Sequence, residues 1–69
     1  MVDANKLRGC IVSHGKTQEE VARAIGITPK TFCIKMKKGV FGSDEIEKMI
    51  DLLDIDDPLS IFFAKTVTP

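Results

Sequence analysis

Four lysines gather in a short stretch in the middle of the chain that contains no acidic residue. Residues 28–38 read Thr-Pro-Lys-Thr-Phe-Cys-Ile-Lys-Met-Lys-Lys, and the lysines are Lys30, Lys35, Lys37 and Lys38. Ammonium groups neutralise the phosphates of a polyanion and release its counterions. The stretch therefore indicates electrostatic binding of a polyanion. Solvated helix faces are the alternative interpretation of the same charges.

The net charge of zero hides a strong asymmetry along the chain. Residues 1–43 hold eight basic and three acidic side chains, whereas residues 44–69 hold seven acidic and two basic ones. The local field, rather than the total charge, governs the approach of a charged partner. The basic part of the chain is therefore able to face a polyanion while the acidic part faces away.

Residue types that catalysis or metal binding requires are sparse. His14 is the only histidine, and Cys10 and Cys33 are too far apart in sequence to form a Cys-x-x-Cys pair. The acidic residues 54–57 lack the later Gly and Glu that a calcium loop requires. We therefore expect no enzyme activity, no metal, no cofactor and no small-molecule substrate. Cys10 is interpreted as a small core residue, and Cys33 as an outward thiol that oxidation could reach.

Length and composition predict one small globular domain. The chain has 69 residues, enough for a single thin core. Its hydrophobic fraction of 43% and charged fraction of 29% argue against a disordered chain. No apolar run approaches the length of a membrane-spanning helix, and the first residues lack the features of a signal peptide. We expect a cytoplasmic protein with reduced cysteines and no membrane partner.

Capping residues and glycines predict an all-α fold of five short helices. No segment alternates polar and apolar residues over the length of a strand. The clearest amphipathic spacing is that of the fourth helix, where Ile46, Met49, Ile50 and Leu53 share one side. The expected helices cover about residues 3–13, 17–25, 29–38, 44–53 and 58–63.

The second and third helices have the strongest local signals. Thr17 and Glu20 form a capping box, and Thr28 followed by Pro29 begins the third helix. Gly26, between the two helices, supplies the positive φ that a tight turn requires. A turn this short prevents an antiparallel return, so the two helices are expected to cross as in a helix-turn-helix unit.

The 3.6-residue period divides the third helix into an inner and an outer side. Phe32 and Met36 are four residues apart and are expected to face the core. The remaining positions on the same period then point away from the core. They are Lys30, Cys33, Ile34 and Lys37.

Residues 17–32 resemble the motif of the Cro/repressor-like (XRE-type) helix-turn-helix family of phage and bacterial transcriptional regulators. The family pattern has Gln first, Ala four residues on, Gly four further, and apolar residues after the turn and in the second helix of the motif. Gln18, Ala22, Gly26, Ile27 and Phe32 occupy these places. The resemblance implies a five-helix, lambda-repressor-like domain over residues 1–64, with its motif at about 17–38 and a frayed tail at 65–69.

The resemblance implies sequence-specific binding of double-stranded DNA by a transcriptional regulator of phage or prophage origin. The third helix is then expected in the major groove, where Lys30 bonds a guanine edge or a phosphate and Ile34 touches a thymine methyl. Pro29 and Cys33 are poor polar readers, so modest specificity is expected. The complete set of expected DNA contacts is Thr17, Gln18, Thr28, Pro29, Lys30, Cys33, Ile34, Lys35, Lys37 and Lys38.

Apolar residues leave an alternative function and a question of assembly open. The alternative is a protein-interaction module, an antirepressor or assembly partner, that uses the apolar side of the third helix and the C-terminal phenylalanines. Leu59, Phe62 and Phe63 are interpreted either as a lid over the core or as the contact of a homodimer. Such a dimer would set two recognition helices about one turn of DNA apart.

Overall fold

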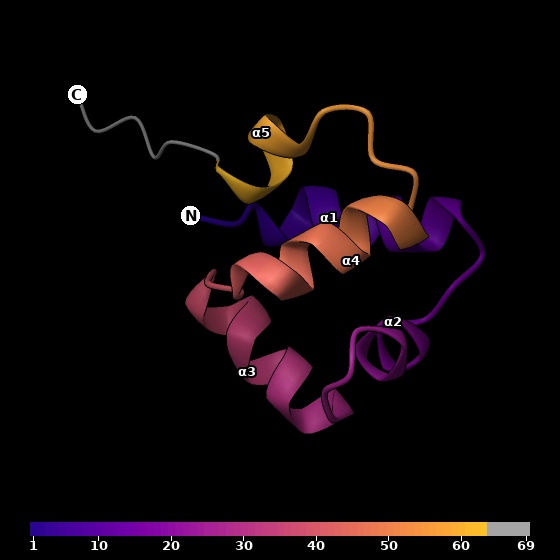
Figure 1. Ribbon diagram of the computed structural model, residues 1–69, viewed down its shortest axis with the longest axis vertical. Helices are drawn as coiled ribbons and strands as arrows, with labels where there is room; N and C mark the ends of the chain where they lie inside the picture. The colour runs from indigo at the N-terminus through magenta and orange to yellow at the C-terminus, as the bar shows by residue number, and fades with distance from the viewer. Residues whose placement is uncertain (64–69) are drawn as a thin grey trace.

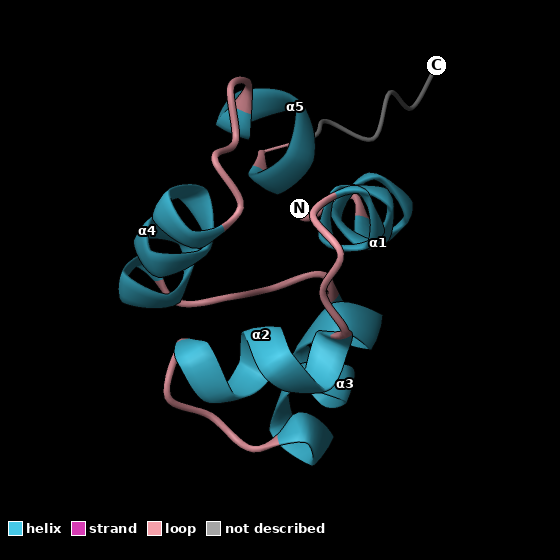
Figure 2. Cartoon of the chain, turned by 90° about the vertical axis from the view of Figure 1, so that its right-hand side faces the viewer, coloured by secondary structure: helices cyan, strands magenta, loops and turns pink. Residues whose placement is uncertain are grey.

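The structure is a computed structural model that describes residues 1–63 and is all-helical across them. Figure 1 shows helices α2 and α3 at one end of the molecule and α5 at the other, with α1 and α4 between them, and Figure 2 shows the same order from the side. The prediction of an all-α fold with five helices is confirmed for this part of the chain. The bounds are α1 (Ala4–Ser13), α2 (Gln18–Ala24), α3 (Pro29–Lys38), α4 (Ser43–Leu52) and α5 (Pro58–Phe62).

The capping predicted at the start of α2 and the predicted start of α5 are confirmed by hydrogen bonds. The amide of Glu20 donates to the Thr17 hydroxyl at 3.1 Å, and the Thr17 amide donates to the Glu20 carboxylate at 2.9 Å. This is the reciprocal pair that the capping box predicts. At α5, the amide of Ser60 donates to the Asp57 carboxylate at 3.3 Å. The frayed tail predicted for 65–69, and residue 64 itself, lie outside the described residues.

The start of α4 differs by one residue from the prediction. The helix begins at Ser43 rather than after it, and Gly42 is the N-cap residue. The Gly42 amide donates to the carboxylate of Glu45 at 2.8 Å. Because the glycine has no side chain to cap the helix, this reach-back by Glu45 satisfies one of the amides at the helix start.

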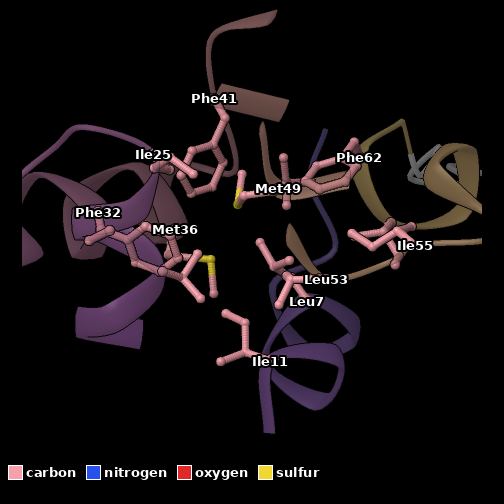
Figure 3. Close-up of a cluster of buried hydrophobic side chains, with 14 residues drawn as sticks. Leu7, Ile11, Ile25, Phe32, Met36, Phe41, Met49, Leu53, Ile55 and Phe62 are labelled. Atoms are coloured by element: carbon pink, nitrogen blue, oxygen red, sulfur yellow. The ribbon is translucent and has the colours of Figure 1, made fainter. Parts of the chain in front are cut away.

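All five helices and the loop after α3 contribute buried residues to the core. Phe32 and Phe41 pack with their ring centroids 5.3 Å apart and their planes tilted by 55°, a favourable geometry for aromatic rings. Phe41, from the loop after α3, is therefore a buried member of the core. Figure 3 shows further core side chains that converge from α1, α3, α4 and α5. Fully buried members include Leu7, Ile11, Val21, Ala22, Met49 and Leu53.

The residues before α1 hold the start of the chain against the end of α3 and against α5. The amide of Val2 donates to the carbonyl of Gly39 at 2.8 Å, and the amide of Asp3 donates to the carbonyl of Ile61 at 2.6 Å. Val2 is buried, and the carboxylate of Asp3 caps α1 by accepting from the Lys6 amide at 3.1 Å. The N-terminal segment therefore connects the end of α3 with α5, a connection that the sequence did not predict.

Candidate nucleic-acid interface

The turn between α2 and α3 sets the direction of α3 relative to α2. Gly26 has a φ of +87°, and the Ile27 amide donates to the Ala22 carbonyl at 3.0 Å. A left-handed conformation of this kind suits glycine because it has no Cβ. The predicted positive φ of Gly26 is confirmed. In Figure 1 the view runs nearly along α2, while α3 lies beside it and is seen from the side.

The first turn of α3 is fixed by Thr28 and Pro29. The Thr28 hydroxyl accepts from the Thr31 amide at 3.2 Å and donates to the Thr31 hydroxyl at 2.9 Å. Pro29 occupies the first helical position, where a missing amide proton has no cost. Both residues are exposed, yet the Thr28 hydroxyl is already engaged in the cap.

The inner side of α3 is anchored in the core. Phe32 and Met36 are buried, as their spacing predicts. Behind them, α2 packs against α1, α3 and α4 and contributes the fully buried Val21 and Ala22. The orientation of α3 about its own axis is therefore determined by apolar packing on one side.

The opposite side of α3 is exposed, and we call it the α3 outer face. Its central apolar residue, Ile34, is 45% exposed. On a helix whose inner positions are locked into a core, residues on the other side of the 3.6-residue period have no partner within the domain. The α3 outer face consists of Lys30, Cys33, Ile34 and Lys37, all of which are exposed.

The lysines of α3 differ in whether a carboxylate is paired with them. Lys35 is half-buried, and its Nζ lies 2.6 Å from Oε2 of Glu45 on α4. Lys30, Lys37 and Lys38 are exposed and form no ion pair with any residue in 1–63. From the sequence alone, all four lysines of α3 are expected to contact a polyanion. The structure separates Lys35 from the others because its ammonium already has a carboxylate partner.

The groups around Glu45 lower the pKa of its carboxyl group. Burial by itself would raise the pKa of Glu45, but hydrogen bonds from Lys35 and from the Gly42 amide, with the positive charges of Lys35 and Lys48, bring the pKa below its ordinary value. The carboxylate is therefore ionised at neutral pH and holds the Lys35 ammonium at the α3–α4 boundary.

The start of α2 contributes less than the sequence suggested. The Thr17 hydroxyl is engaged in the capping box, whereas the side chain of Gln18 is exposed. Next to them, Glu19 pairs with Arg23, whose Nη2 lies 2.8 Å from Oε1 of the carboxylate. At this helix end, Gln18 is therefore the side chain left available for a contact with phosphate.

The apolar residues of α5 and of the position after it differ in how far they are buried. Phe62 is 2% exposed and belongs to the core, whereas Leu59 is 68% exposed and Phe63 is 56% exposed. The expected contact of two copies through Phe62 is corrected accordingly, because that ring fills the interior beneath α5. Leu59 and Phe63 are the members of this cluster that remain accessible to a partner.

The two cysteines differ in their exposure to solvent. Cys33 is exposed, whereas Cys10 is half-buried and packs against the core, as predicted. Burial, together with the negative charge of Asp56, raises the pKa of the Cys10 thiol. The Cys10 thiol is therefore expected to be a poorer nucleophile than the accessible thiol of Cys33.

Other kinds of site have little support in the described part of the chain. Within residues 1–63 no three His, Cys, Asp or Glu side chains lie together as metal ligands, and no helix is both long and apolar enough to cross a membrane. A pocket of about 190 Å³ beside Val2, Phe41 and Phe62 is smaller than the roughly 300–1,000 Å³ of usual ligand pockets. The α3 outer face is therefore the strongest candidate.

In comparisons with models of protein families, with curated proteins and with solved structures, no match to this chain was found.

Proposed function

We propose that the protein binds double-stranded DNA through the α3 outer face and regulates transcription. The observation that carries the proposal is the contrast between the two sides of α3. Phe32 and Met36 fix one side in the core, while Lys30 and Lys37 stand on the other without a carboxylate partner in residues 1–63. A protruding cationic helix of this kind fits the major groove, which is about 12 Å wide.

In this proposal, α2 and α3 act as a helix-turn-helix. α2 would lie across the phosphate backbone with Gln18 at its first turn, and α3 would lie in the major groove with the α3 outer face toward the base edges. Lys30, Lys37 and Lys38 would neutralise phosphates and fix the position of the helix. The resemblance of residues 17–32 to Cro/repressor-like regulators supports this arrangement and suggests a phage or prophage origin.

The distribution of acidic residues favours one orientation on the polyanion. Asp54, Asp56 and Asp57 are exposed and belong to the segment between α4 and α5, which Figure 1 shows at the end of the molecule away from α3. Negative charge there is repelled by phosphate, whereas the unpaired lysines of α3 are attracted. Electrostatic steering therefore presents the α3 outer face to the DNA.

The proposal is tested by titrating a fluorescent random-sequence duplex and measuring anisotropy at several salt concentrations. We expect binding that weakens steeply with salt, because phosphate neutralisation releases counterions. Lys30→Ala and Lys37→Ala should each lower the slope of log K against log salt by about one unit. Lys48→Ala, which removes an exposed lysine from α4, is the matched control and should leave the slope nearly unchanged. Absence of binding at low salt would overturn the proposal.

A protein-interaction module is the second candidate, and exposed apolar side chains favour it. Ile34 on α3 and Leu59 and Phe63 near α5 are large, apolar and exposed. Exposed apolar groups of this size are found at protein interfaces. If the folded wild-type protein binds no duplex at low salt, this function replaces DNA binding.

If the duplex is bound, selection of bound fragments from a genomic library identifies the operator.

A further inference from the structure

The α3 outer face has an unusual chemical composition for a surface that reads bases. α3 runs from Pro29 to Lys38 with the sequence PKTFCIKMKK and contains no Arg, Asn or Gln. Asn and Gln make the bidentate hydrogen bonds that read adenine, and Arg or Lys make those that read guanine. Lysine is therefore the one residue type on α3 that is able to make a bond of this kind. At the centre of the face lies Ile34, an alkyl side chain that is 45% exposed.

Ile34 lies between two cationic anchors. It follows Lys30 by four residues and precedes Lys37 by three, so the two lysines are separated by about 10 Å along the helix axis, given a rise of about 1.5 Å per residue. This separation is similar to the roughly 12 Å width of the major groove. Lysine stems are long and flexible, whereas a β-branched side chain in a helix keeps essentially one rotamer. The lysines thus suit the phosphates, and the rigid isoleucine suits a fixed place at the floor of the groove.

The floor of the major groove offers one kind of alkyl partner. Base edges there are hydrogen-bond donors and acceptors, apart from the C5 position of pyrimidines, which carries a methyl group in thymine. The same methyl group in the same position distinguishes 5-methylcytosine from cytosine. Against a bare C5 position, Ile34 would cover polar edges and lose its contact with a methyl group, and both effects are unfavourable.

We infer that the α3 outer face discriminates the C5 substituent of pyrimidines in duplex DNA, favouring thymine over uracil and 5-methylcytosine over cytosine through Ile34. The inference rests on the proposed function and adds a substrate class to it. Where the lysines of α3 bond phosphates they fix the position of the helix but carry no sequence information, so the alkyl contact of Ile34 supplies the discrimination.

The test uses pairs of duplexes that differ in the C5 methyl group alone. The first pair has alternating A·T pairs made with thymine or with uracil, and the second has alternating G·C pairs made with cytosine or with 5-methylcytosine. Burial of one methyl group corresponds to about a fourfold change in Kd. We expect the methylated member of each pair to bind about fourfold more tightly in anisotropy titrations at one fixed salt concentration.

Two variants show whether Ile34 is the source of the effect. Ile34→Ala should bring both ratios close to one, because the alkyl side chain that contacts the methyl group is gone. Val12→Ala shortens an exposed alkyl side chain on α1, outside the α3 outer face, and should leave both ratios as in the wild type. Circular dichroism checks that both variants remain helical; Ile34→Val is the milder substitute if Ile34→Ala is not folded, and its expected effect is a reduced ratio.

The outcomes separate this inference from the proposed function. Salt-dependent binding with equal affinity for the methylated and unmethylated duplexes would overturn the inference and leave DNA binding in place. An unchanged ratio in Ile34→Ala would also overturn it, because the methyl effect would then arise from another side chain or from DNA shape. No binding of any duplex at low salt would remove the proposed function itself.

Discussion

The ammonium of Lys35 and the carboxylate of Glu45 meet at 2.6 Å across the boundary between α3 and α4. The same carboxylate accepts from the Gly42 amide at 2.8 Å, so one side chain both caps α4 and holds the C-terminal part of α3. Both partners are partly shielded from water, which strengthens the pair relative to a fully exposed one. This contact links the side chain of Lys35 on α3 to the first turn of α4.

The first prediction concerns acid stability. The pKa of Glu45 in the folded protein is lower than its ordinary value of 4.5, so its contribution to stability is present above pH 4.5 and is lost as the pH falls through the folded pKa. Glu45→Gln should lower the free energy of unfolding by about 1–2 kcal/mol at neutral pH. Urea unfolding at several pH values should show the difference from wild type shrinking in acid. Glu47→Gln, an exposed carboxylate on the same helix, is the control, and a loss of stability in Glu45→Gln that is equal at all pH values would contradict the prediction.

The second prediction separates the lysines of α3. Lys35→Ala should leave the salt dependence of DNA binding nearly unchanged, because the Lys35 ammonium is paired with Glu45, whereas Lys37→Ala should lower its slope by about one unit. Anisotropy titrations of one duplex at several salt concentrations measure both slopes. Equal losses of slope in the two variants would mean that Lys35 leaves Glu45 for the phosphates.

The third prediction concerns the turn before α3. An added Cβ at Gly26 meets no atom within 4 Å, so Gly26→Ala tests the backbone conformation at φ +87° rather than a collision. We expect a loss of about 1 kcal/mol in the free energy of unfolding, because alanine disfavours a positive φ. Gly9 lies within α1 and also has open space around its Cβ position, so Gly9→Ala should stabilise the protein by about 0.5–1 kcal/mol. Thermal unfolding of the two variants would contradict this account if both shifts had the same sign.

The fourth prediction concerns the aromatic residues of α5. Phe62→Ala should cost about 3–5 kcal/mol, because it empties a buried volume beneath α5, and Leu59→Ala should change stability by less than about 0.5 kcal/mol. If two copies associate through this region, Leu59→Ser and Phe63→Ser should weaken the association without unfolding the protein. Sedimentation at several protein concentrations, combined with chemical unfolding, distinguishes the two roles. A stable, fully folded Phe62→Ala would contradict the core role.

The fifth prediction uses the exposed thiol of the α3 outer face. A maleimide should modify Cys33 readily and Cys10 slowly, because burial raises the pKa of the Cys10 thiol and reduces its thiolate fraction. Duplex DNA should protect Cys33 from modification and leave the rate at Cys10 unchanged. Mass spectrometry of the labelled protein follows both sites. Saturating DNA that left Cys33 as reactive as before would mean that the DNA binds elsewhere.

Local features of the sequence determined the helices of this protein. The capping box of Thr17 and Glu20, the Thr28-Pro29 start and the positive φ of Gly26 involve residues within a few positions of one another, so spacing predicts them. The side of α3 that faces the core also follows from the period of Phe32 and Met36. These features predicted the exposed α3 outer face before its tertiary contacts were known.

Contacts between residues far apart in sequence were decided by the tertiary structure alone. The pairing of Lys35 with Glu45, the hydrogen bonds of Val2 and Asp3 to Gly39 and Ile61, and the burial of Phe62 beside an exposed Phe63 depend on how helices pack. A helical period gives the direction of a side chain but not the element that it meets. The lysines of α3 therefore looked equivalent in sequence, and only the position of α4 separated the paired Lys35 from the lysines left for a partner.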